Sequence, residues 1–483
     1  MIRTMVDRIA AHPLAVLVIA YLCYFALGAG QEGMNFDSAT YSVIARNMAE
    51  DGRWFNPTYT DFYHTTFTAH APLVMWADAL VFLVTGPHDW AARLFGALCT
   101  LGAIVVAFLL GNETGGKELG FLSGLVLLLT YNFIQIGNSS MLDVPVSFFM
   151  LVALWGIVRL LNNRATVPAC VLTGVALAFS FLAKGVVSAP AWITLAVVTL
   201  TFRREWLRSP RFWLIPCIAL GIVFAYFALD RVYADGAFVR EYFGQQIWGQ
   251  WADSGDRAEA DWWLFSFRFL KLYFPFVILL PAGLYLLIRK RVIALYPVAI
   301  AFIVFALFSS ASDKLYHHYF CPAYAFAAPL AALPLVSVLK GDRLKWVTAV
   351  FAVLWVLLCA GVAIGGVRLH SPRAPEINEA TPRVLQLLRD HPDRYGLFVV
   401  DGGPNWKYVA YAAWYWRSDI LCVPALEEAA KRLRSDHRFA YVFFKTPDRP
   451  SDAVLRENRL SPYYESEGIV IYTSMGGVSG FPW

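Results

Sequence analysis

Four charged residues in this sequence stand beside long apolar runs, and their types could carry out acid–base and phosphate chemistry. Two are carboxylates: Asp37 in Asn-Phe-Asp-Ser-Ala-Thr-Tyr and Asp143 in Ser-Ser-Met-Leu-Asp-Val-Pro. Two are amines: Lys184 in Phe-Leu-Ala-Lys-Gly and Lys314 in Ser-Asp-Lys-Leu-Tyr-His-His-Tyr. A charge at the centre of a membrane helix costs about 2.5–3.5 kcal/mol on insertion scales and often marks function. Together, these groups suit an anionic head group and a hydroxyl that must lose its proton.

The composition places most of the chain in lipid. It is 58% hydrophobic and 16% charged, with a mean hydropathy of +0.52, whereas a soluble domain carries roughly 25% charged residues. A bilayer core of ~30 Å needs about 20 apolar residues per helix, which predicts about eleven transmembrane helices. The expected spans begin near Pro13, Ala91, Leu119, Leu142, Val167, Val187, Phe212, Trp263, Val292, Tyr319 and Trp346.

Basic residues alternate between successive turns, which predicts the orientation. The basic turns contain Arg159 and Arg164; Arg203, Arg204, Arg208 and Arg211; Arg289, Lys290 and Arg291; and Lys340, Arg343 and Lys345. By the positive-inside rule these turns and the amino terminus are cytoplasmic. An odd number of spans then places the carboxyl-terminal segment outside. All four charged residues named first fall at the same outer depth.

Three segments are therefore expected on the outer side. The first loop, residues 31–90, has a predicted amphipathic helix at Ser38–Glu50 and a more apolar one near Pro72–Thr85. The second, residues 232–262, carries Phe243, Ile247, Trp248 and Trp251 at the spacing of an interfacial helix.

The third outer segment, residues 368–483, follows a transmembrane domain predicted at 1–367. Apolar runs alternate there with helical patterns, which predicts a small α/β domain. The apolar runs are Leu397–Val400, Ile420–Val423, Phe439–Phe444 and Ile469–Tyr472, and the clearest helical pattern is Glu427–Arg434.

The motifs resemble the GT-C class of membrane glycosyltransferases, in particular the bacterial branch related to aminoarabinose transferases and protein O-mannosyltransferases. The matching stretches occur in the family's order over most of the membrane region. They are Asp37–Met48, Ala71-Pro72-Leu73 with Trp76, Ala91–Leu94, Leu142-Asp143 with Pro145 and Phe148-Phe149, Ala183–Gly185, and Lys314–Tyr319 with Pro322.

This resemblance implies roles for individual residues. Asp37 would be the general base or would orient the acceptor, and Asp143 would support the site as a second catalytic residue. Tyr41, His64 and His70 are assigned to the acceptor or the sugar. The donor phosphate and its lipid are assigned to Arg46, Lys184, Lys314, His317, His318 and Tyr319.

The resemblance also implies the reaction. A sugar would pass from a polyprenyl-phosphate donor to an acceptor, lipid A, lipopolysaccharide or another envelope glycan, on the periplasmic side of the bacterial inner membrane. Protein hydroxyls are the alternative acceptor. Relatives often read Glu-Lys-Pro-Pro in the first loop, whereas this chain reads Ala69-His70-Ala71-Pro72, so the sugar or acceptor could differ from theirs.

Simpler interpretations of these residues stay open. Asp37 and Asp143 could be helix N-caps, and Lys184 could be a snorkelling residue at a helix end. Arg46 could pair with Glu50 at i+4. His64 and His70 could flank a metal or could simply be solvated, and His317 and His318 could only pack at the interface.

Two other classes of protein are alternatives to a transferase. A secondary transporter or flippase would show inverted repeats and midplane charges, but here the charges cluster at the outer edge. A non-catalytic scaffold would place no constraint on Asp37. No resident cofactor is indicated, a divalent metal is left open, and nothing points to nucleic acid.

Overall fold

The computed structural model describes residues 11–31, 33–164, 166–244, 262–310, 316–339, 341–364, 375–389, 395–400 and 404–474, with the backbone alone at 262–264. The chain forms two compact units. Unit one comprises Met1–Gln31 and Thr68–Leu369, and unit two comprises Glu32–Phe67 and His370–Trp483. Residues 32–67, which the sequence analysis places in the membrane region, thus belong to the unit of the carboxyl-terminal segment.

Unit one is built from apolar helices. Within the described residues, seven are long and apolar enough to cross a membrane, and an eighth span results if the bent pair Phe265–Leu272 and Phe276–Arg289 counts as one. The seven are Asp89–Leu128, Asp143–Leu161, Val167–Phe202, Pro210–Tyr233, Ile293–Ser310, His317–Val338 and Asp342–Ala363. The prediction of a helical membrane protein is confirmed.

Internal breaks explain why the expected starts outnumber the continuous helices. Helix α5 (Asp89–Leu128) has non-helical backbone at Gly115 and Gly116, between the starts expected near Ala91 and Leu119. A 3₁₀ turn, Gly185–Ser188, separates α8 (Val167–Lys184) from α9 (Ala189–Phe202). The first expected span is α2 (Pro13–Ala29), which is apolar but shorter. The count of eleven stays a prediction.

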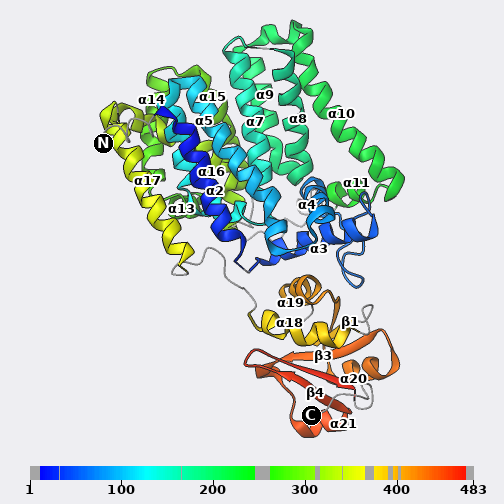
Figure 1. Ribbon diagram of the computed structural model, residues 1–483. Coiled ribbons are helices and arrows are strands. Elements are labelled where there is room, and N and C mark those ends of the chain that lie inside the picture. Colours follow the sequence, from blue (N-terminus) through cyan, green and yellow to red (C-terminus); the bar gives the residue numbers. More distant parts are fainter. Residues whose placement is uncertain are drawn as a thin grey trace. The chain divides into compact units, whose positions relative to one another are not determined.

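Helix α16 (Cys321–Val338) forms the centre of unit one. Every residue from Cys321 to Ala332 is buried, as expected for a helix that is apolar on all sides. It packs on α5, α7 (Asp143–Leu161), α14 (Leu280–Arg289) and α15 (Tyr296–Ser310), several of which surround it in Figure 1. The other helices of unit one are α4 (Leu73–Thr85), α6 (Tyr131–Gly137), α10 (Pro210–Tyr233), α11 (Ala237–Glu241), α13 (Trp262–Leu272) and α17 (Asp342–Ala363).

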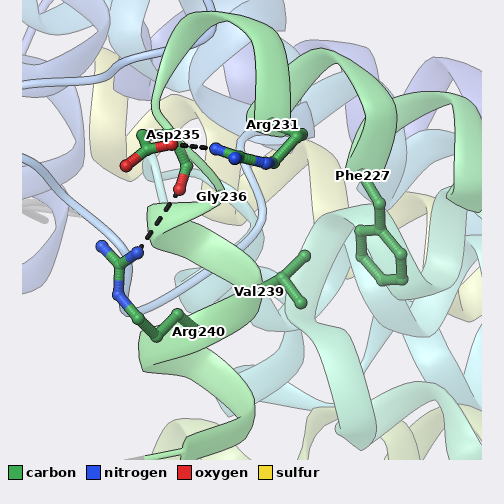
Figure 2. Close-up of a pocket in the computed structure, with 6 residues that line it drawn as sticks. All are labelled: Phe227, Arg231, Asp235, Gly236, Val239 and Arg240. Atoms are coloured by element: carbon green, nitrogen blue, oxygen red, sulfur yellow. Dashed lines mark hydrogen bonds and ion pairs between the residues drawn. The ribbon is translucent and has the colours of Figure 1, made fainter.

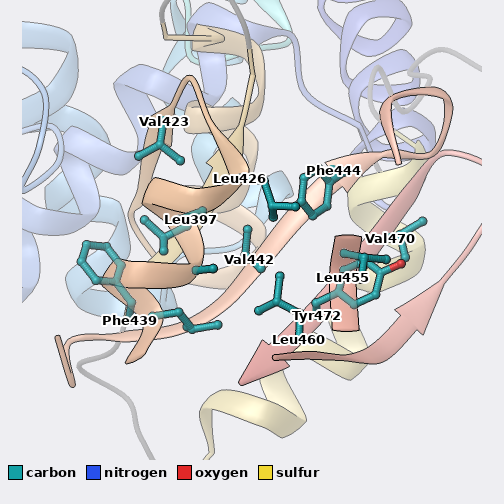
Figure 3. Packing of buried hydrophobic residues seen from close by; sticks show 13 residues of the cluster. Leu397, Val423, Leu426, Phe439, Val442, Phe444, Leu455, Leu460, Val470 and Tyr472 are labelled. Atoms are coloured by element: carbon teal, nitrogen blue, oxygen red, sulfur yellow. The ribbon is translucent and has the colours of Figure 1, made fainter. Parts of the chain in front are cut away.

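Unit two contains a five-stranded sheet in the order β2-β1-β3-β5-β4. Its strands are β1 (Tyr395–Val399), β2 (Ile420–Val423), β3 (Phe439–Lys445), β4 (Leu460–Glu465) and β5 (Ile469–Ser474). The first three are parallel, and β5 runs antiparallel to β3 and β4. Figure 3 shows its core, where Leu426 of α20 (Leu426–Ser435) packs with sheet residues including Leu397 and Val442. β2, β3 and β5 coincide with predicted apolar runs or extend them, β1 overlaps the run Leu397–Val400 but ends at Val399, and β4 was not predicted.

The predicted first-loop helices are both present. Helix α3 (Phe36–Asp51) starts two residues before the predicted Ser38 and packs on α19 (Trp406–Tyr411) and the π-helical turn Ala412–Trp416, within unit two. The second is α4, in unit one. The remaining helices of unit two are α18 (Pro375–Leu388) and α21 (Asp452–Glu457). Of the predicted interfacial helix at 232–262, Ile247, Trp248 and Trp251 lie outside the described residues.

Close approach at one glycine gives a testable prediction about this packing. A Cβ on Gly96 of α5 would lie 2.4 Å from the Ser139 carbonyl oxygen and 2.7 Å from that of Gly137. Both contacts are to backbone atoms, which can move only at a cost in free energy. We expect Gly96→Ala to destabilise the protein by about 1–3 kcal/mol. The measurement is thermal unfolding in detergent.

The matched control is Gly221→Ala in α10, where an added Cβ meets nothing within 4 Å. Because alanine favours helix over glycine by ~0.8–1 kcal/mol, this variant should be neutral or slightly more stable. Equal melting temperatures for both variants would contradict the packing argument.

Candidate functional site

A buried ion pair joins two of the four residues singled out from the sequence. Lys184 Nζ, on the last residue of α8, lies 2.5 Å from Asp143 Oδ1, on the first residue of α7. Their side chains are 7% and 3% exposed. The N-cap of α7 is Leu142, without a side-chain hydrogen bond, so Asp143 is not the cap. Lys184 is buried and paired, which rules out a snorkelling role.

A tyrosine ring covers the ammonium group of this pair. Lys184 Nζ lies 4.6 Å from the centroid of the Tyr319 ring, a cation–π distance. Tyr319 belongs to the 3₁₀ turn His317–Phe320, which leads into α16. The ring of His318 is buried and meets Tyr319 edge-on at 4.6 Å, and His317 lies 5.3 Å from His318. Three elements distant in sequence thus meet at one cation.

His70 lies near the same charges. The pKa of its imidazole is lowered from 6.5 to about 3: burial is the largest cause, the positive charge of Lys184 adds to the lowering, and Asp143 opposes it. The neighbouring Ala71 packs against Leu182 of α8, which brings this part of the loop to the end of that helix. At neutral pH, His70 is therefore an uncharged group beside the pair. We call Asp143, Lys184, Tyr319, His318 and His70 the lysine cluster.

Asp37 belongs to unit two. It lies in the first turn of α3, and the cap is Asn35, whose Oδ1 accepts a hydrogen bond from the Ser38 backbone N–H at 2.8 Å. The N-cap interpretation of Asp37 is therefore wrong. Burial raises the pKa of the nearby Tyr59 phenol, and the charge of Asp37 adds to the rise.

The other predicted residues of unit two have identified contacts. Arg46 is buried, donates to the Ala413 carbonyl oxygen at 2.7 Å, and lies 3.7 Å from Glu50 at i+4. Tyr41 meets the Phe67 ring edge-on, and His64 is exposed beside Trp406. Lys314 lies outside the described residues, and its assignment stays a prediction.

One buried acid, Asp78, was not predicted from the sequence. Asp78 of α4 is fully buried and accepts a hydrogen bond from Ser140 Oγ at 2.5 Å, three residues before Asp143. Its sequence signal is an acid in the middle of an otherwise apolar 13-residue helix. Burying a carboxyl group in apolar surroundings costs free energy, so this position could have been identified from the sequence as a candidate functional residue.

A surface pocket of about 500 Å³ lies at the α10–α11 corner of unit one (Figure 2). Its two arginines are already engaged: Arg231 pairs with the Asp235 carboxylate, and Arg240 donates to the Asp235 carbonyl oxygen at 3.4 Å. Beyond the pocket, Tyr242 accepts a hydrogen bond from the Val186 backbone N–H at 2.8 Å, next to Gly185. This segment therefore supports the end of α8. Within the described part of the chain, no three His, Cys, Asp or Glu residues gather as a metal site would require.

Comparisons with known proteins agree with this architecture. Residues 69–227 match the family model described as dolichyl-phosphate-mannose-protein mannosyltransferase. The chain is 24% identical to the undecaprenyl phosphate-alpha-4-amino-4-deoxy-L-arabinose arabinosyl transferase of Shewanella sediminis, over 62% of this chain and 55% of that protein. It thus spans little more than half the length of that curated relative.

Solved structures extend the likeness over nearly the whole chain. ArnT from Cupriavidus metallidurans in the apo state superposes with a TM-score of 0.75 at 19% identity, over 96% of this chain and 98% of that one. The same protein bound to undecaprenyl phosphate gives a TM-score of 0.69 at 18% identity, over 99% of each chain.

The chain therefore has the fold of the GT-C class of membrane glycosyltransferases, as the sequence motifs predicted. In sequence, part of the chain is similar to a bacterial aminoarabinose transferase, and residues 69–227 match the protein mannosyltransferase family model.

The ion pair gives a prediction about stability. Removing one partner leaves an uncompensated buried charge, so Asp143→Asn should cost about 3–5 kcal/mol. The double variant Asp143→Asn/Lys184→Gln buries no charge at either position and should recover much of that loss. Thermal unfolding in detergent measures both, and a double variant less stable than Asp143→Asn would contradict the pairing.

The environment of His70 predicts a pH effect. Its pKa is about 3 when folded, against an ordinary 6.5, so its contribution to stability is present above pH 6.5 and is lost as pH falls toward 3. We expect His70→Gln to reduce the drop in melting temperature between pH 7 and pH 4. The exposed His64→Gln is the control and should show the wild-type drop.

Proposed function

We propose that this protein is an integral membrane glycosyltransferase that moves a sugar from a polyprenyl-phosphate donor to an acceptor lipid or glycan. The observation that carries the proposal is the lysine cluster, where Asp143 and the Tyr319 ring hold a buried ammonium in place. A related fold bound to undecaprenyl phosphate supports the choice of donor.

The chemistry asks for a base and for stabilisation of a leaving phosphate. The acceptor oxygen forms a bond to the anomeric carbon. The bond from that carbon to the phosphate oxygen breaks, and its electron pair goes to the phosphate. The acceptor proton goes to Asp37 in this proposal, a step for which a positioned carboxylate is worth about 10²–10⁴ in rate.

The leaving phosphate is the proposed partner of Lys184. A preorganised cation in surroundings that exclude water stabilises developing negative charge far more than it would in bulk water. The Tyr319 ring, against which His318 packs, restricts the position of the ammonium. Lys314 is assigned to the same phosphate on the strength of the sequence alone. A requirement for a divalent metal is left open.

The acceptor we favour is lipid A, lipopolysaccharide or another envelope glycan, by analogy with the aminoarabinose transferases. A second candidate is a protein hydroxyl, favoured by the match of residues 69–227 to the mannosyltransferase family. Either acceptor would be met on the periplasmic side of the inner membrane. The positive-inside pattern supports a cytoplasmic amino terminus and a periplasmic carboxyl-terminal segment.

The test supplies purified full-length protein with a panel of polyprenyl-phosphate sugars and follows release of the bare carrier, together with the mass of each acceptor. We expect turnover by wild type and a fall in kcat of about 10²–10⁴ for Asp37→Asn, because the base is removed. If wild type releases no bare carrier from any of the donors, a secondary transporter becomes the favoured class of protein.

The matched control is Asp51→Asn. It makes the same chemical change at the exposed carboxyl end of α3 and should leave kcat unchanged. Equal turnover by Asp37→Asn and Asp51→Asn would remove Asp37 from the mechanism while leaving the transferase itself standing.

A further inference from the structure

Asp78 occupies the middle of the buried face of α4. The other buried residues of that helix are Val74, Met75, Ala79 and Phe82, all apolar. A carboxyl group on such a face loses its contact with water and must find protein partners. An apolar side chain of similar size would fill the same space, so packing alone does not explain an acid here.

The partner of Asp78 lies on the loop that precedes Asp143. Ser140 Oγ donates to Asp78 Oδ2 at 2.5 Å, while Oδ1 has no hydrogen-bond partner within the described structure. Burial raises the pKa of Asp78 to about 8, and the bond from Ser140 opposes the rise, so the group is mostly protonated at pH 7. The thiol of Cys99 in α5 is an electrostatic neighbour of Asp78.

The loop concerned, residues 138–142, is the α6–α7 connection, and it is buried along its whole length. Three elements hold it. Tyr21 of α2 donates a hydrogen bond to Asn138 Oδ1 at 2.9 Å. The Ser139 carbonyl oxygen packs closely against Gly96 of α5, where there is no side chain. Asp78 of α4 accepts a hydrogen bond from Ser140. The chain then enters α7 at Asp143, the partner of Lys184.

The geometry points to Asp78 as a positioning residue, which acts through Ser140 to fix Asp143 and thereby the Lys184 ammonium. This inference rests on the proposed function, because it assigns Lys184 a place in the reaction. A displacement of about 1 Å at a reacting group can cost on the order of 10² in rate. The contact to Ser140 is three residues from Asp143, close enough to transmit such a displacement.

The variants that test it differ in whether residue 78 can accept a hydrogen bond. Asp78→Asn keeps an oxygen for Ser140, Asp78→Leu does not, and Ser140→Ala removes the donor. We expect Asp78→Leu to lower kcat ~10–100-fold with a change of less than about threefold in the KM for the donor. Asp78→Asn should retain at least about a third of wild-type kcat.

Non-additivity and stability complete the experiment. Because Asp78→Leu and Ser140→Ala break the same contact, the double variant should be no slower than the slower single. Thr85→Val removes a hydroxyl from the same helix without touching the α6–α7 connection and should behave as wild type. A second measurement needs no activity assay. If Asp78 and Asp143 are physically linked, the effects of Asp78→Leu and Asp143→Asn on the melting temperature should not be additive.

The outcomes separate the two proposals. Wild-type kcat in folded Asp78→Leu, or Asp78→Asn as slow as Asp78→Leu, would overturn the positioning role. If Asp78→Leu does not fold, Ser140→Ala decides in its place, and its wild-type kcat would overturn the role equally. An inactive wild type that still shows coupling between residues 78 and 143 would count against the transferase and leave the structural link intact.

Discussion

The ion pair between Lys184 and Asp143 is the constraint on which the architecture of unit one most depends. Taking two charges out of water costs several kcal/mol per ion, and only close geometry recovers that cost. The helices supply more than the contact. Asp143 opens α7, where the helix dipole is positive, and Lys184 closes α8, where it is negative. The antiparallel packing of consecutive helices therefore stabilises each charge before the two meet.

The lysine cluster differs in charge from what the relatives' motif implies. Where the resemblance described from the sequence implies a lysine in the first loop, this chain has His70, which burial and the charge of Lys184 hold neutral. The charges of Asp143 and Lys184 offset each other in the ion pair. A phosphate dianion leaving at this point would need a further cation, which is the role that the sequence analysis gives to Lys314.

The sequence identified Asp143 and Lys184 as candidate site residues, but it predicted neither their ion pair nor what holds that pair in place. Asp143 and Lys184 stood out because charges at the ends of apolar runs are costly, and that argument needs no contacts. Asp78 obeys the same rule, but it lies in the middle of a short helix whose burial depends on α5 and α8, which periodicity does not reveal. Periodicity places the start of α3 two residues late, at Ser38, and this is why Asp37 resembles a helix cap in the sequence. Residues 32–67 could not be assigned to unit two, because their partners lie some 350 residues away in the chain.

Because residues 32–67 belong to unit two, the carboxyl-terminal segment holds the helix that carries Asp37. Both ends of α3 are tied within unit two: Tyr411 donates to the Met34 carbonyl oxygen at 3.0 Å, and Arg46 donates to that of Ala413 at 2.7 Å. The loop that follows is tied as well, since the Asp61 backbone N–H donates to Asp419 Oδ2 and the Cys422 N–H donates to Tyr63. A helix of 16 residues with little intrinsic stability takes its fixed position from such packing. The placement of Asp37 is therefore a property of the folded carboxyl-terminal segment, so changes in that segment affect the proposed base as directly as changes in α3 itself.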